Sequence, residues 1–195
     1  FALSEYALDV RNPFVGVYHD RSAGVLVRKP IPMEAIRNVQ SECRAVDDDL
    51  RWLIALISDT GMRLAEGAGL LKQDFVGLNT KHPYVSVVKH PWRNLKTASS
   101  ERKIPLVGQA LWAARRIVEA DNASDLAFRR YNRKPITAAN SASAALNKWL
   151  RQYVPVGCTM HSFRHSMRDR LRAVQCPADI TDQIGGWTTD GVGQG

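Results

Sequence analysis

The sequence predicts an α+β protein that is predominantly α-helical and contains a small three-stranded antiparallel sheet. Two patterns predict this class. In several stretches apolar residues recur every three or four positions, the spacing that gives an α-helix one apolar side. Between residues 75 and 106 the pattern changes to short runs of valine, isoleucine and aromatic residues, which are typical of β-strands. A chain of 195 residues is also long enough to bury a substantial core.

The expected helices begin after residue 30. Pro32 occupies a first-turn position, where its missing N–H group is not needed. Three aspartates at 47–49 place favourable negative charge at the start of the following helix. The predicted helices cover residues 32–43, 50–58, 107–120, 137–153 and 159–175, with shorter ones opened by Arg63 and containing Ile180 and Ile184.

The sheet is expected from three short runs, near residues 75–78, 84–88 and 104–106. Residues 90–100 separate the last two runs, so Lys96 lies on or beside a hairpin. A lysine in a turn is ordinarily just solvated. Residues 1–30 contain several prolines and glycines and few periodic apolar positions, so we expect an extended lead-in there and one folded domain over residues 31–195.

The net charge of +8 is unevenly distributed. Residues 61–134 hold 14 basic and 6 acidic side chains, a concentration that favours a surface for a polyanion. The basic run 129–134, with Tyr131 inside it, could contact a phosphate backbone, although a solvated charge run explains it nearly as well. The expected DNA contacts are Arg93, Arg129, Arg130, Arg133 and Lys134.

Other features exclude several classes of protein. No apolar run is long enough to cross a bilayer, and no N-terminal signal is visible. The three cysteines, Cys43, Cys158 and Cys176, lack the spacing of a zinc site or a disulfide framework and fit reduced thiols in a cytoplasmic protein. No P-loop is present. We therefore expect no metal, no cofactor and no membrane partner.

Two short stretches carry groups suited to phosphate chemistry. In HSFRH at 161–165, two histidines that can move protons flank an arginine, and helical spacing would place His161, Arg164 and His165 on one face. Arg63 and Glu66, three residues apart, can form an ion pair that directs the guanidinium. Two histidines at this spacing also resemble half of a zinc site, but a metalloprotease needs Glu where this chain has Ser162.

Together these stretches resemble the catalytic domain of the tyrosine recombinases, the phage-integrase family of DNA breaking-rejoining enzymes. TGMRLAE at 60–66 is similar to the first arginine box, and LKT at 95–97 with RKIPL at 102–106 is similar to the hairpin that carries the lysine of the family. HSFRH at 161–165 resembles the second box, and GGW at 185–187 resembles the last. Four matches in order cover the chain from about residue 30 onward.

The resemblance implies a role for each matched residue. Arg63 and Arg164 would bind the phosphate, Lys96 would give a proton to the leaving 5′-hydroxyl, and His161 and Trp187 would add hydrogen bonds. His165 would accept or orient the proton of the nucleophile, and Glu66 would hold the arginine box. The covalent 3′-phosphotyrosyl intermediate stores the bond energy, so neither metal nor ATP is required.

The resemblance also implies parts that these residues lack. The nucleophilic tyrosine of the family follows the last box, whereas all five tyrosines here precede the second box, so we expect the nucleophile beyond residue 195 and no cleavage by this fragment. The N-terminal core-binding domain of the family is also absent. We expect double-stranded DNA as partner, a tetramer of the full-length protein on paired sites, and a bacterial or phage-encoded protein near the nucleoid. The alternative is a non-catalytic module that binds DNA or a recombinase, and metal-dependent hydrolysis at His161 and His165 is a distant third.

Overall fold

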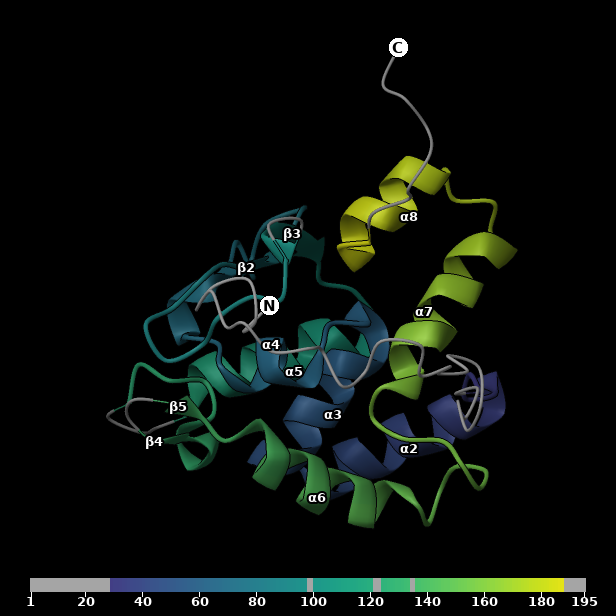
Figure 1. The fold of residues 1–195 in the computed structure, drawn as a ribbon, viewed down its shortest axis with the longest axis horizontal. Helices are drawn as coiled ribbons and strands as arrows, with labels where there is room; N and C mark the ends of the chain where they lie inside the picture. The colour runs from purple at the N-terminus through teal and green to yellow at the C-terminus, as the bar shows by residue number, and fades with distance from the viewer. Residues whose placement is uncertain (1–28, 98–99, 121–123, 134–135, 188–195) are drawn as a thin grey trace, which may run out of the picture.

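The computed structural model describes residues 29–97, 100–120, 124–133 and 136–187 (Figure 1). The expected lead-in over residues 1–30 lies almost entirely outside these ranges. Within them no helix is long and apolar enough to span a membrane.

Seven α-helices form most of the described structure, with α3 at its centre (Figure 1). The helix α3 packs against α2, α4, α5 and α7. Every helix predicted from the sequence is present, with ends that differ by a few residues. The bounds are α2 Met33–Val46, α3 Asp49–Thr60, α4 Leu64–Ala68, α5 Gly108–Glu119, α6 Ala139–Leu150, α7 Ser162–Ala173 and α8 Ala178–Gly185.

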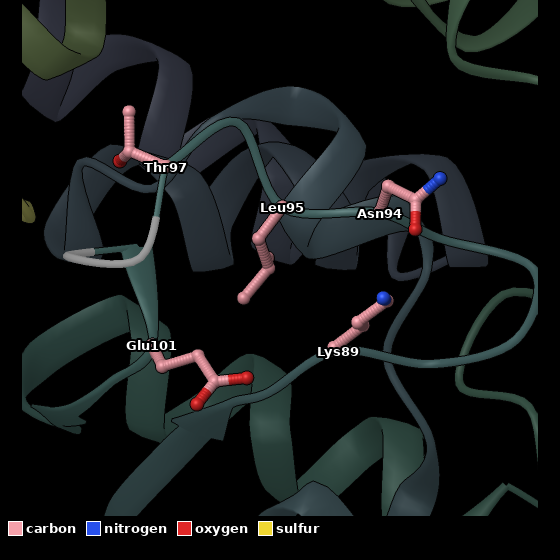
Figure 2. Close-up of a pocket in the computed structure, with 5 residues that line it drawn as sticks. All are labelled: Lys89, Asn94, Leu95, Thr97 and Glu101. Carbon is pink, nitrogen blue, oxygen red and sulfur yellow. The ribbon is translucent and has the colours of Figure 1, made fainter.

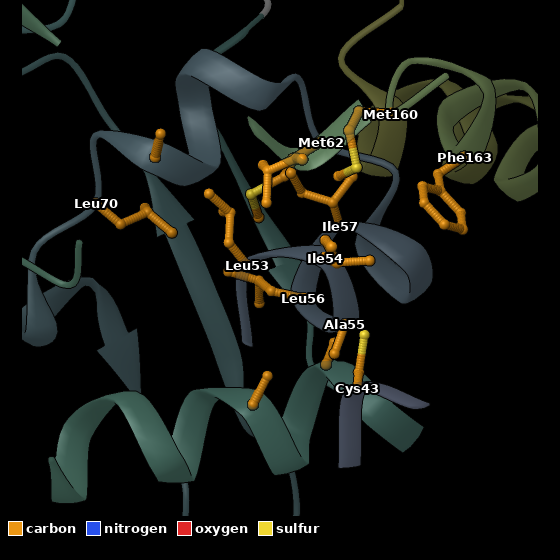
Figure 3. Packing of buried hydrophobic residues seen from close by; sticks show 14 of the residues in the cluster. Cys43, Leu53, Ile54, Ala55, Leu56, Ile57, Met62, Leu70, Met160 and Phe163 are labelled. Atoms are coloured by element: carbon orange, nitrogen blue, oxygen red, sulfur yellow. The ribbon is translucent and has the colours of Figure 1, made fainter. Parts of the chain in front are cut away.

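The core is built around α3, whose residues are buried from Leu53 to its end at Thr60 (Figure 3). The sequence predicted a single apolar stripe, but polar residues at the end of the helix are buried as well. Asp59 explains why this is tolerated, because its carboxylate accepts hydrogen bonds from Gln40 Nε2 of α2, the Gln109 amide of α5 and Arg170 Nη2 of α7. One buried carboxylate therefore ties three helices to α3.

The predicted antiparallel sheet of three strands is confirmed. It has the order β1-β2-β3, with β1 Phe75–Val76, β2 Tyr84–Val87 and β3 Arg102–Pro105. Val85 pairs with Phe75 on one side and with Ile104 on the other. All three side chains are buried, so the sheet covers the core with one face.

A second, two-stranded sheet was not predicted. It pairs β4 Asn132–Arg133 with β5 Ile136–Thr137, directly after the short 3-10 helix η3 Arg129–Tyr131. Asn132 organises this segment because its amide donates to the carbonyls of Ala68 and Phe128, and its oxygen accepts from Thr137. The helix expected from residue 137 consequently begins two residues later.

Candidate active site

The first arginine box follows a left-handed turn at the end of α3. Gly61 has a φ of 62°, and a Cβ there would lie 2.8 Å from Met167 Cβ of α7, so only glycine allows this helix approach. Arg63 then caps α4, and its amide donates to Glu66 Oε2 at 2.8 Å. The turn therefore brings the box against α7.

The ion pair predicted between Arg63 and Glu66 is confirmed. Arg63 Nη1 lies 2.7 Å from Glu66 Oε1, and the Arg63 side chain is 24% exposed. The same Nη1 donates to Ser100 Oγ at 3.1 Å, from the segment that joins β2 to β3. Glu66 and Ser100 therefore aim the guanidinium while part of it stays accessible.

Glu66 is shared by two arginines. Its Oε2 accepts a hydrogen bond from Arg102 Nη2 at 2.9 Å, and the Arg102 side chain is only 2% exposed. Burial alone would raise the pKa of Glu66, but the hydrogen bonds and positive charges of Arg102 and Arg63 outweigh it and hold that pKa below its usual range. Glu66 is therefore a carboxylate at neutral pH.

The second box places its arginine inside the protein. Arg164 is buried, and its Nη1 donates to the carbonyl of Gly61 at 3.1 Å. Its Nη2 is also buried and has no hydrogen-bond partner among the described residues. Burial, followed by repulsion from Arg63, lowers the pKa of Arg164 to about 10. This cation lies close to Arg63 and has an unused donor.

Trp187 lies against the arginine of the second box. The helix α8 ends with Gly186 in a left-handed conformation, and the indole folds back so closely that a Cβ on Gly185 would lie 1.8 Å from Trp187 Cε3. The Arg164 guanidinium carbon lies 4.5 Å from the ring centroid, and that of Arg168 lies 5.1 Å from it. The indole therefore contacts the same arginine that Gly61 holds.

The two histidines of the second box lie at the start of α7. His161 is the N-cap residue, and its ring meets that of His165 edge-on with centroids 5.2 Å apart. His165 is exposed, whereas Arg164 turns inward. The expectation that all three share one face is therefore corrected: the histidine rings are together, and the arginine points into the fold.

Lys96 is exposed on the loop between β2 and β3. Its neighbours Leu95 and Thr97 line a pocket of about 370 Å³, together with Lys89, Asn94 and Glu101 (Figure 2). Figure 2 shows the Leu95 side chain pointing into this pocket. Thr97 Oγ1 lies 2.9 Å from Ser100 Oγ, the partner of Arg63, so a chain of polar contacts links the lysine loop to the arginine box.

Arg93, expected to contact DNA, is buried. Its guanidinium donates to the backbone carbonyls of Glu66 and Val88, and its Cδ approaches Gly69 so closely that a Cβ would lie 2.6 Å away. A guanidinium engaged in this way cannot reach a phosphate backbone. The expectation is corrected, and Arg93 ties the β2–β3 loop to α4.

The basic run 129–134 is placed only in part. Arg129 and Arg130 are exposed, and Arg130 Nε lies 3.4 Å from Asp49 Oδ2. Arg133 belongs to β4, and Lys134 lies outside the described residues. In Figure 1 this segment is at the left edge, far from α7 and α8 at the right. Arg129 and Arg130 are therefore not part of the cluster around Arg164.

Two residues at this site were missed by the sequence analysis. Arg102 was noted only as part of the hairpin, and Arg168 was not noted at all. Their roles depend on partners distant in the sequence, Glu66 and Trp187, so no local spacing indicates them. Among the described residues, no group of three or more His, Cys, Asp or Glu could hold a metal ion.

The arrangement of helices and sheet defines the class of protein. The Tn1549 transposon integrase in complex with circular intermediate DNA matches with a TM-score of 0.61 and 20% identity, over 85% of this chain and 61% of that one. XerA recombinase matches with a TM-score of 0.63 and 15% identity, over 96% of this chain and 64% of that one. XerH site-specific recombinase bound to palindromic difH substrate matches with a TM-score of 0.59 and 17% identity. This match covers 87% of this chain and 49% of that one. The fold is that of a tyrosine recombinase catalytic domain.

A match to a protein-family model identifies the family from the sequence. The model of the phage integrase family matches residues 33–192, and the chain belongs to that family. No curated protein matches the chain by sequence. The chain spans about three-fifths of the Tn1549 integrase and XerA structures that it matches.

Proposed function

We propose that this chain is the catalytic domain of a site-specific DNA recombinase, which cuts and rejoins DNA through a covalent 3′-phosphotyrosyl intermediate. One observation carries the proposal: the buried Arg164 has an unused donor, Nη2, and its cation is repelled by that of Arg63. Two such cations repel each other, and an anion bound between them would offset that repulsion. A phosphodiester is an anion with two oxygens that can accept from both.

The proposed chemistry uses the arginines as fixed electrostatic catalysts. Negative charge accumulates on the non-bridging phosphate oxygens as a tyrosine oxygen forms its bond to phosphorus. Arg63 and Arg164 would stabilise that charge with N–H donors held in advance by Glu66 and Gly61. His161 and Trp187 would add hydrogen bonds, the indole acting only as a donor.

Proton transfer completes the step. The new O–P bond forms as the bond to the 5′-oxygen breaks, and Lys96 would donate the proton that the leaving oxygen needs. His165 would take or orient the proton of the nucleophile. The exposed Lys96 and the contact between Thr97 and Ser100 support this role, because that contact connects the lysine loop to the partner of Arg63.

We place the nucleophile beyond residue 195. The described tyrosines support this because each is engaged elsewhere: Lys103 lies over Tyr84, Tyr131 is buried, and Tyr153 packs on Trp149. A fragment ending at 195 would then bind DNA without cleaving it.

The proposed partner is double-stranded DNA. Arg129, Arg130, Arg133 and Lys134 would serve as backbone contacts, and a tetramer of the full-length protein would act on paired sites without a metal or other cofactor. We further propose that the protein acts on DNA in the cytoplasm.

The test uses the complete recombinase and a duplex selected for binding from a random-sequence pool. Incubation without metal or ATP should give a covalent protein–DNA adduct that survives denaturant and is joined through a tyrosine at the 3′ end. The Arg164→Met variant should bind the duplex and give no adduct. Tight binding with no adduct from the unmodified protein would refute the proposal in favour of a non-catalytic DNA-binding module.

A further inference from the structure

Arg102 of β3 holds three separate elements with one side chain. Its Nη2 donates to Glu66 Oε2 of α4 at 2.9 Å, its Nη1 to the Ser100 carbonyl at 2.7 Å, and its Nε to the Ile184 carbonyl of α8 at 2.8 Å. The side chain is 2% exposed. All three nitrogens of the guanidinium are therefore used inside the protein, and none is left for a ligand.

Two of these acceptors adjoin Arg63. Glu66 is its carboxylate partner, and the Ser100 hydroxyl accepts from its Nη1. The Ser100 hydroxyl also contacts Thr97, the residue after Lys96. A displacement of Arg102 would therefore be transmitted to Arg63 and to the base of the lysine loop.

The third acceptor adjoins Trp187. Ile184 lies in the last turn of α8, and the Trp187 indole folds against the next residue, Gly185. The Trp187 amide donates to the Asp182 carbonyl at 3.0 Å, so the indole is fixed to the end of this helix. In Figure 1 α8 lies to the right of β3, and Arg102 bridges the two.

A guanidinium is suited to this task because it is planar and its donors have fixed directions. Three acceptors bound in one plane are held at fixed positions relative to one another. A lysine keeps the positive charge, but its single ammonium cannot reproduce that geometry. Groups that act on one reacting phosphate must be held within about 0.5 Å of their productive positions.

We infer that Arg102 is a positioning residue that sets Trp187 and the lysine loop in place relative to Arg63. Its effect on the reaction rests on the proposed function, whereas its effect on Trp187 is a property of the fold. Arg102 itself does not touch the substrate.

The first experiment follows Trp187 by fluorine NMR in the chain labelled with 5-fluorotryptophan. Trp187→Phe assigns its resonance among the five tryptophans. In Arg102→Lys the Trp187 resonance should shift or broaden, whereas those of Trp52, Trp112 and Trp149 should stay in place. An unchanged Trp187 resonance in a folded Arg102→Lys chain would overturn the inference.

The matched control is Arg170→Lys. Arg170 also joins a carboxylate and a backbone carbonyl, those of Asp59 and Ser58, but these belong to α3. This variant should leave the Trp187 resonance unchanged. A shift equal to that of Arg102→Lys would show that any lost arginine contact disturbs Trp187, and would contradict a specific role.

A second measurement needs no substitution, so it holds even if Arg102→Lys does not fold. The Nε–H proton of Arg102, bonded to the Ile184 carbonyl, should exchange with water at least tenfold more slowly than that of the exposed Arg129. Equal exchange rates would overturn the inference.

The third experiment measures single-turnover cleavage by the complete recombinase. Arg102→Lys should lower the rate by about 100-fold, the scale expected for a small misplacement of catalytic groups. Combined with Trp187→Phe, it should lower the rate by clearly less than the product of the two single effects, because both act on one group. A full product would contradict positioning of Trp187. No cleavage by the unmodified protein would refute the proposed function and leave the NMR result standing.

Discussion

Arg63 and Arg164 are close enough to repel each other but are held in opposite ways. Arg63 pairs with Glu66 at 2.7 Å and keeps 24% of its side chain exposed. Arg164 is 4% exposed, donates once to a carbonyl, and has a buried nitrogen with no partner among the described residues. The first arginine carries its own counterion, whereas the second is paired with none of the described carboxylates.

The difference shows that two neighbouring arginines can be stabilised unequally by their surroundings. Glu66 pairs with both Arg63 and Arg102, so it neutralises part of the local positive charge and orients the two guanidinium groups. Arg164 has no such partner among the described residues, and the unfavourable free energy of burying its charge beside Arg63 appears as its lowered pKa.

Arg164→Met should have the largest effect, because it removes the arginine that has no carboxylate partner among the described residues. Removing a preorganised donor should lower the cleavage rate of the complete recombinase by about 100-fold or more. The stability of the chain should nevertheless rise by about 2 kcal/mol at neutral pH. At about 1.4 kcal/mol per pKa unit, the lowered pKa amounts to about 3 kcal/mol, and the lost bond to Gly61 offsets about 1 kcal/mol.

Urea unfolding checks this prediction, with Arg170→Met as control because Arg170 is paired with Asp59 and should lose stability. The destabilising effect of Arg164 is full below about pH 10, where the guanidinium is protonated in both states. It should shrink as the pH rises from about 10 towards the ordinary pKa of arginine, because only the unfolded chain then holds the proton. A stability loss in Arg164→Met like that of the control would contradict the account.

Glu66→Gln removes the counterion of Arg63. Arg102 would keep a buried charge without its carboxylate, so unfolding should become easier by about 3 kcal/mol at pH 7. The lowered pKa of Glu66 also makes its contribution to stability depend on pH. Its contribution is full above the ordinary value of 4.5 and is lost as the pH falls below 4.5 through the folded value, so the gap to the variant should narrow in acid.

Denaturant unfolding at pH 7 and below pH 4.5 measures that gap. Glu34→Gln is the control, because Glu34 is exposed in the first turn of α2. A gap that stays constant on acidification would show that the Glu66 carboxylate is not held by the two arginines.

Gly61→Ala should push apart the two boxes. The new Cβ would lie 2.8 Å from Met167 Cβ, at a backbone φ of 62°. Gly157 is the matched control, because its φ of 89° is also left-handed but nothing lies within 4 Å. Gly61→Ala should therefore cost about 2 kcal/mol more than Gly157→Ala in thermal or urea unfolding. Equal costs would mean that α7 can yield at Met167.

Arg168→Ala gives the smallest expected effect. It removes the cation from one face of Trp187 and an ion pair with Asp182 at 3.8 Å, and it also relieves repulsion of Arg164. These contributions oppose each other, so stability should change by only about 0.5 kcal/mol. A loss above about 2 kcal/mol in urea unfolding would make Arg168 a structural anchor instead.

Local patterns allowed part of this site to be predicted. Arg63 and Glu66 are three residues apart, and their ion pair follows from helical spacing. The α+β class followed from two periodicities, and the structure confirms it. His161, Arg164 and His165 were expected to share one face, but Arg164 is buried and donates to the Gly61 carbonyl.

The remainder depends on contacts between distant segments. Arg102 meets Ile184 across 82 positions, and no pattern in β3 indicates that partner. Arg93 was expected to contact DNA, yet it is buried and its guanidinium donates to two backbone carbonyls. The second sheet was missed because Asn132, which organises it, lies within a run of charges.

A crystal structure of the chain grown with sulfate tests the central claim most directly. The account predicts one sulfate bound between Arg63 and Arg164, with Arg164 Nη2 donating to it and Trp187 still against the Arg164 guanidinium. Sulfate bound only at other sites, with the two guanidinium groups pointing apart, would contradict it.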